Sequence, residues 1–222
     1  EHLLSSNRAW RQGILTRKPW YFEEMGKTHQ PTYMWIGCAD ARITADRIIN
    51  VPQGEMFVAR NIANVVVSTD TNLMSSVYYA VEVLEVEHII LCGHYDCGGV
   101  KAALQNVDHR PPLENWLSNI RDVHRLHYDE LEAIEDEVQK QRRLVELNVI
   151  ESCMNLFKTG VVQRRRVFTS KNPAFPYTQP ALHAVVYDPS EGILKKLPVD
   201  FASLLSKYAG IYNLYRKLPR AS

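Results

Sequence analysis

Two short apolar segments, each followed at once by metal-capable side chains, constrain the fold of this chain more than any other feature. The segment Tyr33–Gly37 leads into Cys38, and the segment Glu87–Cys92 leads into His94 and Cys97. Each segment is bounded by turn-forming residues and has the length of a buried strand. Parallel strands in an α/β sheet end at one shared edge, where ligands gather. We therefore expect two neighbouring parallel strands that bring these three side chains together.

The remaining pattern is typical of an α/β protein with a central mostly parallel β-sheet flanked by helices. A further strand is expected at Glu55–Arg60, and apolar residues at helical spacing predict a helix over Asn72–Val86, so that strand, helix and strand form a right-handed crossover. The other predicted elements are helices over Gly99–Asn106, Leu113–His127 and Val138–Lys158, strands over Leu182–Tyr187 and Ile193–Leu197, and a closing C-terminal helix over Phe201–Leu218.

We expect one domain over residues 1–222, because 222 residues suffice for one sizeable core. Residues 1–30 are interpreted as an N-terminal helical arm, in which Asn7 caps a helix that runs to about Lys18 and ends at Pro19. Residues 169–180 contain three of the prolines and are interpreted as an irregular, insertion-like loop.

Charge and composition narrow the range of partners. Lys and Arg number 26 against 25 Asp and Glu, and this balance argues against nucleic acid as a main partner. No stretch approaches the roughly 20 apolar residues of a membrane-spanning helix. The four cysteines are too few for a disulfide-stapled secreted domain and are interpreted as reduced thiols. We expect a location in the cytoplasm or in an organelle matrix or stroma, and a targeting segment removed before Glu1 is compatible with the sequence.

The three converging side chains have the chemistry of a zinc site. Two thiolates from Cys38 and Cys97 with one imidazole from His94 make three protein ligands and leave a fourth position open, as in catalytic zinc sites. Zinc lowers the pKa of bound water to about 7 and so provides a nucleophile. Because thiolates donate charge to the metal, hydroxide forms less easily than with three imidazoles, and we expect activation at alkaline pH.

Asp40 and Arg42 follow Cys38 at intervals of two residues and can face the same cavity. The carboxylate has two plausible roles. It can accept a hydrogen bond from the nucleophile while Arg42 holds it bidentately, or it can become the fourth metal ligand and close the site. Taken singly, each motif is better explained by a buried thiol, a surface ion pair or a turn. Together, and followed by Gly98 and Gly99 at the start of a helix, they indicate a metal.

The segments Cys38–Arg42, Arg60–Asn64 and Cys92–Gly99 resemble the signatures of β-class carbonic anhydrases, and Arg143–Val149 continues the resemblance. The resemblance implies reversible hydration of carbon dioxide to bicarbonate and a proton, with one zinc ion per subunit on the three ligands and with Asp40 and Arg42 as the catalytic pair. It also implies active clefts at a dimer interface, and hence a homodimer or homotetramer.

Further residues are assigned by the same resemblance. In one subgroup, bicarbonate binds a second, non-catalytic pocket and favours a closed site, and the corresponding residues here are Trp35, Arg60 and Tyr187. Core packing and an ion pair explain those three equally well. The expected switch has Asp40 on zinc at lower pH and on Arg42 at higher pH. The substrate pocket is assigned to Tyr79 and Val83 of a partner subunit, together with Gly98 and Gly99.

The sequence departs from the family pattern in its last third, and this leaves other functions open. The late strand reads His183–Tyr187 with Ala and Val where the family usually has Gly and Trp, and Ala41 replaces a frequent Ser. The altered last third motivates one alternative, a catalytically weak, carbonic-anhydrase-like structural subunit of a larger assembly. A less favoured alternative is hydrolysis of a carbon dioxide analogue such as carbon disulfide.

Overall fold

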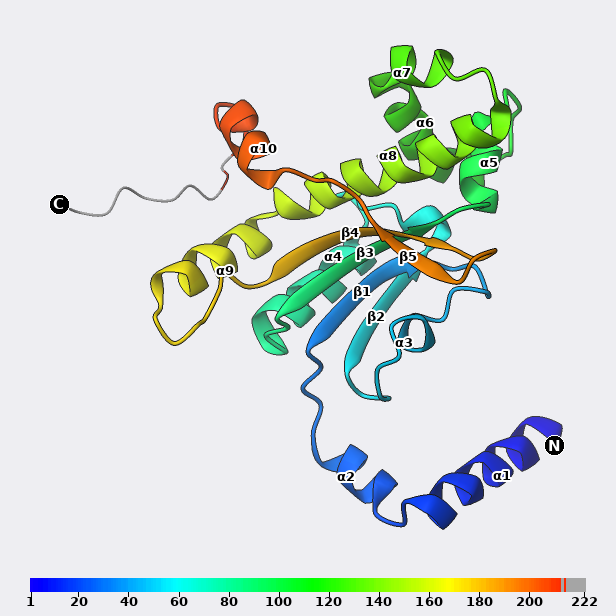
Figure 1. Cartoon of the computed structure of the whole chain (residues 1–222), viewed down its shortest axis with the longest axis vertical. Helices are drawn as coiled ribbons and strands as arrows, with labels where there is room; N and C mark the ends of the chain where they lie inside the picture. The colour runs from blue at the N-terminus through cyan, green and yellow to red at the C-terminus, as the bar shows by residue number, and fades with distance from the viewer. Residues whose placement is uncertain (213, 215–222) are drawn as a thin grey trace.

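The structure is a computed structural model that describes residues 1–212 and 214, apart from the side chains of Ala202 and Leu205. At its centre the described residues form a five-stranded sheet in the order β2-β1-β3-β4-β5 (Figure 1). Strand β1 pairs in parallel with β2 and β3, β3 pairs in parallel with β4, and β4 pairs antiparallel with β5. The predicted mostly parallel sheet is thus confirmed. The strands are β1 Tyr33–Cys38, β2 Met56–Asn61, β3 His88–His94, β4 Ala181–Asp188 and β5 Ile193–Lys196.

Helices flank the sheet, and α8 runs across one of its faces (Figure 1). Helices α1 and α2 lie away from the sheet, as an arm (Figure 1). None of the helices in the described part of the chain is long and apolar enough to cross a bilayer. The helices are α1 His2–Arg17, α2 Tyr21–Lys27, α3 Ala45–Ile48, the 3-10 turn η1 Ile62–Asn64, α4 Thr71–Tyr78, the π-helical turn η2 Tyr79–Val83, α5 Gly98–Leu104, α6 Leu113–Leu126, α7 Tyr128–Glu132, α8 Glu137–Phe157, α9 Gly160–Lys171 and α10 Phe201–Tyr208.

The side chains of β1 alternate between two cores, as the two-residue period of a strand requires. Met34 and Ile36 enter the larger core, which also contains the buried face of α8. Trp35 points to the opposite face and packs with Ile43 and Cys92. Because both faces are covered, β1 is almost entirely buried, as expected for a central parallel strand.

Three predicted boundaries are wrong, and the short helix α3 was missed together with α7 and α9. Helix α1 begins at His2 instead of Asn7, and the hydroxyl of Ser5 donates to the carbonyl of His2 within the first turn. Thr169–Lys171, predicted as loop, is the last turn of α9, because the Thr169 hydroxyl donates to the carbonyl of Arg165 one turn earlier. Helices α7 and α9 were not predicted, since the sequence of each lacks a clear apolar period.

The closing helix is shorter than predicted. Helix α10 ends at Tyr208, and the chain then turns, with the amide of Ile211 donating to the carbonyl of Tyr208. This turn brings Leu214 into a small core with Met154 and Phe157. The rest of the predicted helix, residues 213 and 215–218, lies outside the described residues.

Gly93, on β3, provides a test of how tightly α8 packs on the sheet. A Cβ atom at Gly93 would lie 2.5 Å from Cγ2 of Val149 and 3.3 Å from Cγ1 of Val145. Neither buried valine can move away without disturbing the core, so we expect Gly93→Ala to lower the free energy of unfolding by about 1–3 kcal/mol. The measurement is urea unfolding. Gly210→Ala is the control because a Cβ there meets nothing within 4 Å and Gly210 lies outside the helices. Equal stability of the Gly93 variant and the parent would contradict this account of the interface.

Candidate metal centre

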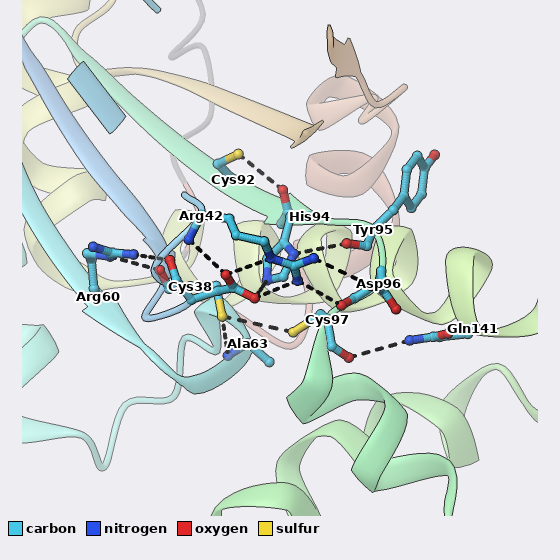
Figure 2. A network of polar contacts seen from close by, with 12 residues as sticks. Cys38, Arg42, Arg60, Ala63, Cys92, His94, Tyr95, Asp96, Cys97 and Gln141 are labelled. Carbon is cyan, nitrogen blue, oxygen red and sulfur yellow. Dashed lines mark hydrogen bonds and ion pairs between the residues drawn. The ribbon is translucent and has the colours of Figure 1, made fainter. Parts of the chain in front are cut away.

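Three buried donor atoms meet at the carboxyl edge of the sheet. The sulfurs of Cys38 and Cys97 and a ring nitrogen of His94 all lie within 4.8 Å of one another. No other group of three or more such side chains is this close in the part of the chain that the structure describes. The predicted convergence of residues far apart in sequence is confirmed (Figure 2).

Strand register explains why these side chains meet. Gly37 lies opposite Cys92 in the parallel pairing of β1 and β3, so both strands finish at nearly the same level. Cys38 is the last residue of β1 and His94 the last of β3. Cys97 follows after a two-residue turn, as the residue that precedes α5. The sequence spacing therefore becomes a spatial cluster through the pairing of two adjacent strands.

The donor set fits a zinc ion. The two sulfurs are 3.9 Å apart, far longer than a disulfide bond. Two sulfurs bound tetrahedrally at about 2.3 Å from one zinc ion are about 3.8 Å apart. Nε2 of His94 is fully buried and has no hydrogen-bond partner among the described residues. A buried nitrogen without a partner is costly unless a metal takes up its lone pair.

The contact between the two sulfurs moves the pKa values of the two thiols in opposite directions. A hydrogen bond from the Cys97 thiol is the main cause that lowers the pKa of Cys38, and the same contact with the Cys38 thiolate raises the pKa of Cys97. The amide of Ala63 also donates to the sulfur of Cys38, at 3.4 Å. One sulfur is therefore prepared as an anionic ligand, and a divalent cation would make the second thiolate favourable as well.

The tautomer of His94 is fixed by its neighbour. Its Nδ1 lies 3.0 Å from the carbonyl oxygen of Tyr95, which can only accept a hydrogen bond. Nδ1 therefore carries the proton, and Nε2 keeps its lone pair toward the two sulfurs. This is the usual arrangement of a metal-binding histidine.

Asp40 lies beside the cluster and is held by Arg42. The Arg42 side chain donates to both carboxylate oxygens, at 3.0 and 2.7 Å. These hydrogen bonds hold the pKa of Asp40 well below its usual range. Oδ2 of Asp40 is 3.9 Å from Nε2 of His94, so the carboxylate is close to the donors. Arg42 also donates to the carbonyl of Asp96, at 3.2 Å, and so links the turn after β1 to the turn after β3.

The three residues assigned to a bicarbonate pocket share one face of the sheet. Trp35 and Tyr187 belong to the same core cluster, and Arg60 lies opposite Gly37, two residues after Trp35. Nε1 of Trp35 is buried without a partner among the described residues. The Arg60 guanidinium donates to the carbonyls of Cys38, at 2.8 Å, and Asp40. Their role in binding stays a prediction.

The residues assigned to the substrate pocket fall into two groups. Gly98 and Gly99 start α5 next to Cys97, and Gly98 leaves open space where a side chain would be. Tyr79 and Val83 are exposed and line a cavity of about 630 Å³ together with residues 29–32. They lie before the start of β3, whereas His94 lies at its end, so one chain does not bring them to the donors. Their assignment to the cleft of a partner subunit stays a prediction.

One group of contacts was missed by sequence reasoning. The Tyr95 hydroxyl donates to Glu146 on α8, at 2.6 Å, and Arg142 covers the Tyr95 ring. Burial, followed by the bond to Glu146, raises the pKa of Tyr95, so the phenol keeps its proton and acts as the donor. Arg142 in turn pairs with the buried Asp188, at 3.1 Å. No local motif signals contacts between residues that lie 46 to 51 positions apart along the chain.

Comparison with known proteins gives a consistent result. A family model described as carbonic anhydrase matches residues 33–194. The chain is 45% identical over 214 residues to a carbonic anhydrase of Emericella nidulans, a match that covers 96% of this chain and 90% of the relative. A carbonic anhydrase of Candida albicans is 32% identical over 179 residues, which are 80% of this chain and 60% of that protein.

Solved structures agree with the sequence comparison. A tetrameric β-carbonic anhydrase of Sordaria macrospora superimposes with a TM-score of 0.81 at 33% identity, covering 89% of this chain and 96% of that one. A β-carbonic anhydrase of Aspergillus fumigatus gives a TM-score of 0.82 at 29% identity, covering 94% of this chain and 96% of that one.

Asp188 should make stability depend on acid pH. Hydrogen bonds from Ser190, more than the nearby Arg142 and Lys195, lower the pKa of Asp188 from 3.8 to about 2. Because the folded value is the lower one, this contribution to stability is fully present above about pH 4 and is lost as the pH falls through about 2. We expect Asp188→Asn to be less stable than the parent at pH 7, with the difference shrinking between pH 4 and 2. Urea midpoints of both proteins across this range test it, and a constant difference would contradict it.

Proposed function

This chain belongs to the β-class carbonic anhydrase family, and we propose that it catalyses the reversible hydration of carbon dioxide to bicarbonate and a proton, with zinc held by Cys38, His94 and Cys97. The observation that carries the proposal is the convergence of two sulfurs and one imidazole nitrogen within 4.8 Å, with a carboxylate beside them. When bound, zinc acts as a Lewis acid that makes a water molecule nucleophilic near neutral pH.

Asp40 and Arg42 direct the nucleophile in this proposal. The carboxylate of Asp40 accepts the hydrogen bond of the nucleophile and so fixes the direction of its lone pair. Arg42 keeps that carboxylate ionised and away from the metal, because its bidentate hydrogen bonds compete for the same oxygens. Two thiolate ligands donate charge to the metal, which supports activation at alkaline pH.

The substrate pocket is proposed to be shared between two copies of the chain. Gly98 and Gly99 line it beside Cys97, and Tyr79 and Val83 of the partner subunit complete it. The exposure of Tyr79 and Val83, 44% and 53%, supports a role for this surface in contacts between subunits. The chain then works as a homodimer or homotetramer, and its Sordaria macrospora relative is tetrameric.

Bicarbonate is proposed to regulate the site from a second pocket made by Trp35, Arg60 and Tyr187. Two features support this: the unpartnered Nε1 of Trp35, and the bonds that Arg60 makes to the carbonyls of Cys38 and Asp40. An anion that competes for the Arg60 guanidinium would loosen the segment that carries Asp40. Asp40 could then leave Arg42 and close the site as the fourth metal ligand.

The compartment is also a proposal. The cytoplasm, or the matrix or stroma of an organelle, keeps thiols reduced. All four cysteines of the chain are free and buried, and two of them are the proposed ligands, which supports a reducing location.

Zinc content and turnover test the function together. We expect the parent chain to bind one zinc ion and to hydrate carbon dioxide in a stopped-flow assay of proton release. Cys38→Ser should lose most of the zinc, whereas Asp40→Ala should keep it and lose turnover about 10-fold or more. Asp46→Ala, on the exposed start of α3, is the control and should match the parent. Unchanged turnover in both site variants would end the proposal, and a zinc-loaded parent without turnover would favour a structural subunit.

A variant of Tyr187 tests the second pocket. Tyr187→Phe removes one hydrogen-bond donor with little change in volume, so we expect the bicarbonate concentration for half-inhibition to rise about 10-fold, since a hydrogen bond to a charged group contributes about 1.5–3 kcal/mol. Tyr33→Phe is the control, because Tyr33 belongs to the same core cluster but lies at the start of β1, away from the carboxyl edge of the sheet. Inhibition is measured at fixed pH and ionic strength. Equal inhibition of the parent and the Tyr187 variant would count against bicarbonate in this pocket.

A further inference from the structure

Tyr95 lies between two of the proposed metal ligands in the sequence, and its side chain contacts residues that are distant along the chain. Tyr95 as a whole residue is only 6% exposed, although the side chain of the neighbouring Asp96 is 71% exposed. Figure 2 shows that the Tyr95 carbonyl points toward His94 while the ring points away from it. The backbone of this residue therefore touches the metal centre, and its side chain reaches a different part of the fold.

The ring of Tyr95 is fixed by two elements. Helix α8 contributes Glu146, which accepts the hydroxyl hydrogen bond at 2.6 Å, and Arg142, whose guanidinium carbon lies 4.3 Å from the ring centre. Strand β5 contributes Lys195, with Nζ 5.4 Å from the same ring centre. Both distances lie in the range of cation–π contacts.

Asp188 holds these two cations in place. Its carboxylate is 1% exposed and lies 3.1 Å from Arg142 and 3.5 Å from Lys195. The backbone is tied at the same point, because the amide of Tyr95 donates to the carbonyl of Tyr187, at 3.0 Å. Tyr95 is thus connected through its amide, ring and hydroxyl to α8 and to the hairpin of β4 and β5.

The turn that follows Tyr95 needs such support. Asp96 has a φ of 56°, in the left-handed region that Gly adopts freely and that Asp enters only occasionally. Strained backbone of this kind persists only where the surroundings hold it. The Tyr95–Asp96 peptide carries the carbonyl that orients His94, so a rotation of this peptide would remove the acceptor from Nδ1.

We propose that Tyr95 is a positioning residue for the zinc ligand His94, acting through its own carbonyl and anchored by Glu146 and Arg142. The inference rests on the proposed zinc function. It assigns the contacts of α8 and of the β4–β5 hairpin a role in metal affinity as well as in stability. Outer groups that orient a metal-binding histidine typically change metal affinity by about 10–100-fold when they are altered.

The test compares two tyrosines that make the same type of bond. Tyr95→Phe removes the bond to Glu146. Tyr177→Phe removes a bond of 2.5 Å to Glu87, which precedes β3 at the opposite edge of the sheet, together with a contact of 3.2 Å to His88. The zinc dissociation constant of each purified protein is measured by competition with a chelator. We expect it to rise about 10-fold in Tyr95→Phe and to stay within about two-fold in Tyr177→Phe.

A spectroscopic readout separates positioning from stability. Cobalt is exchanged for zinc in each protein, and its visible absorption bands, which depend on ligand geometry, should change in Tyr95→Phe and not in Tyr177→Phe. Glu146→Gln keeps an acceptor of the same size without charge, so it should shift the zinc dissociation constant in the same direction by a smaller factor. If Tyr95→Phe does not fold, Glu146→Gln is the variant that tests the proposal.

The outcomes distinguish this inference from the proposed function. A parent protein that binds no zinc would overturn both. A parent that binds zinc normally, with zinc dissociation constants and cobalt spectra unchanged in Tyr95→Phe and Glu146→Gln, would overturn only the role of Tyr95. Loss of thermal stability without those changes would likewise show that Tyr95 is structural alone.

Discussion

The parallel pairing of β1 with β3 is the constraint on which the rest of the molecule depends. It ends two buried strands at one level, with Cys38 on one and His94 on the other. A shift of the register by one residue would turn Cys38 toward the opposite face of the sheet. The large core under α8 prevents such a shift, since Met34 and Ile36 are fully buried on that side. The hydrophobic core thereby holds the strand ends that place the sulfur and the imidazole within 4.8 Å of each other.

The end of β2 and the turn that follows it support the metal centre without supplying a ligand. Arg60 donates to the carbonyl of Cys38, and the amide of Ala63 donates to its sulfur. Ala63 has a φ of 61°, and the side chain of Asn148 on α8 holds it by donating to its carbonyl, at 2.8 Å. Asn61 closes the same turn through two hydrogen bonds to Val65. The segments through which the sequence resembles its family are thus the segments that hold one thiolate in place.

The sequence was sufficient to predict the helices and strands that have a local or periodic pattern. It failed where individual contacts determine where an element begins or ends. The strands and α8 were placed to within about two residues, since buried strands and a long apolar period leave clear patterns. The metal set was found because Cys38, His94 and Cys97 lie at or just after the ends of two predicted strands. The start of α1 and the end of α10 depend on individual hydrogen bonds and on a turn toward Met154. The anchoring of Tyr95 by α8 could not be predicted, because nothing near Tyr95 in the sequence identifies Glu146 as its partner.

The strength of the Asp40–Arg42 pair bears on whether the site can close. The pair has good bidentate geometry, but 49% of the Arg42 side chain is exposed, against 20% for Asp40. Water therefore screens the attraction, and a pair of this kind is much weaker than a buried one. Arg42 also has a second partner in the carbonyl of Asp96, so it does not become an isolated charge when Asp40 leaves. The carboxylate is consequently held near the three donors by an interaction that keeps it ionised and that is weaker than a buried ion pair.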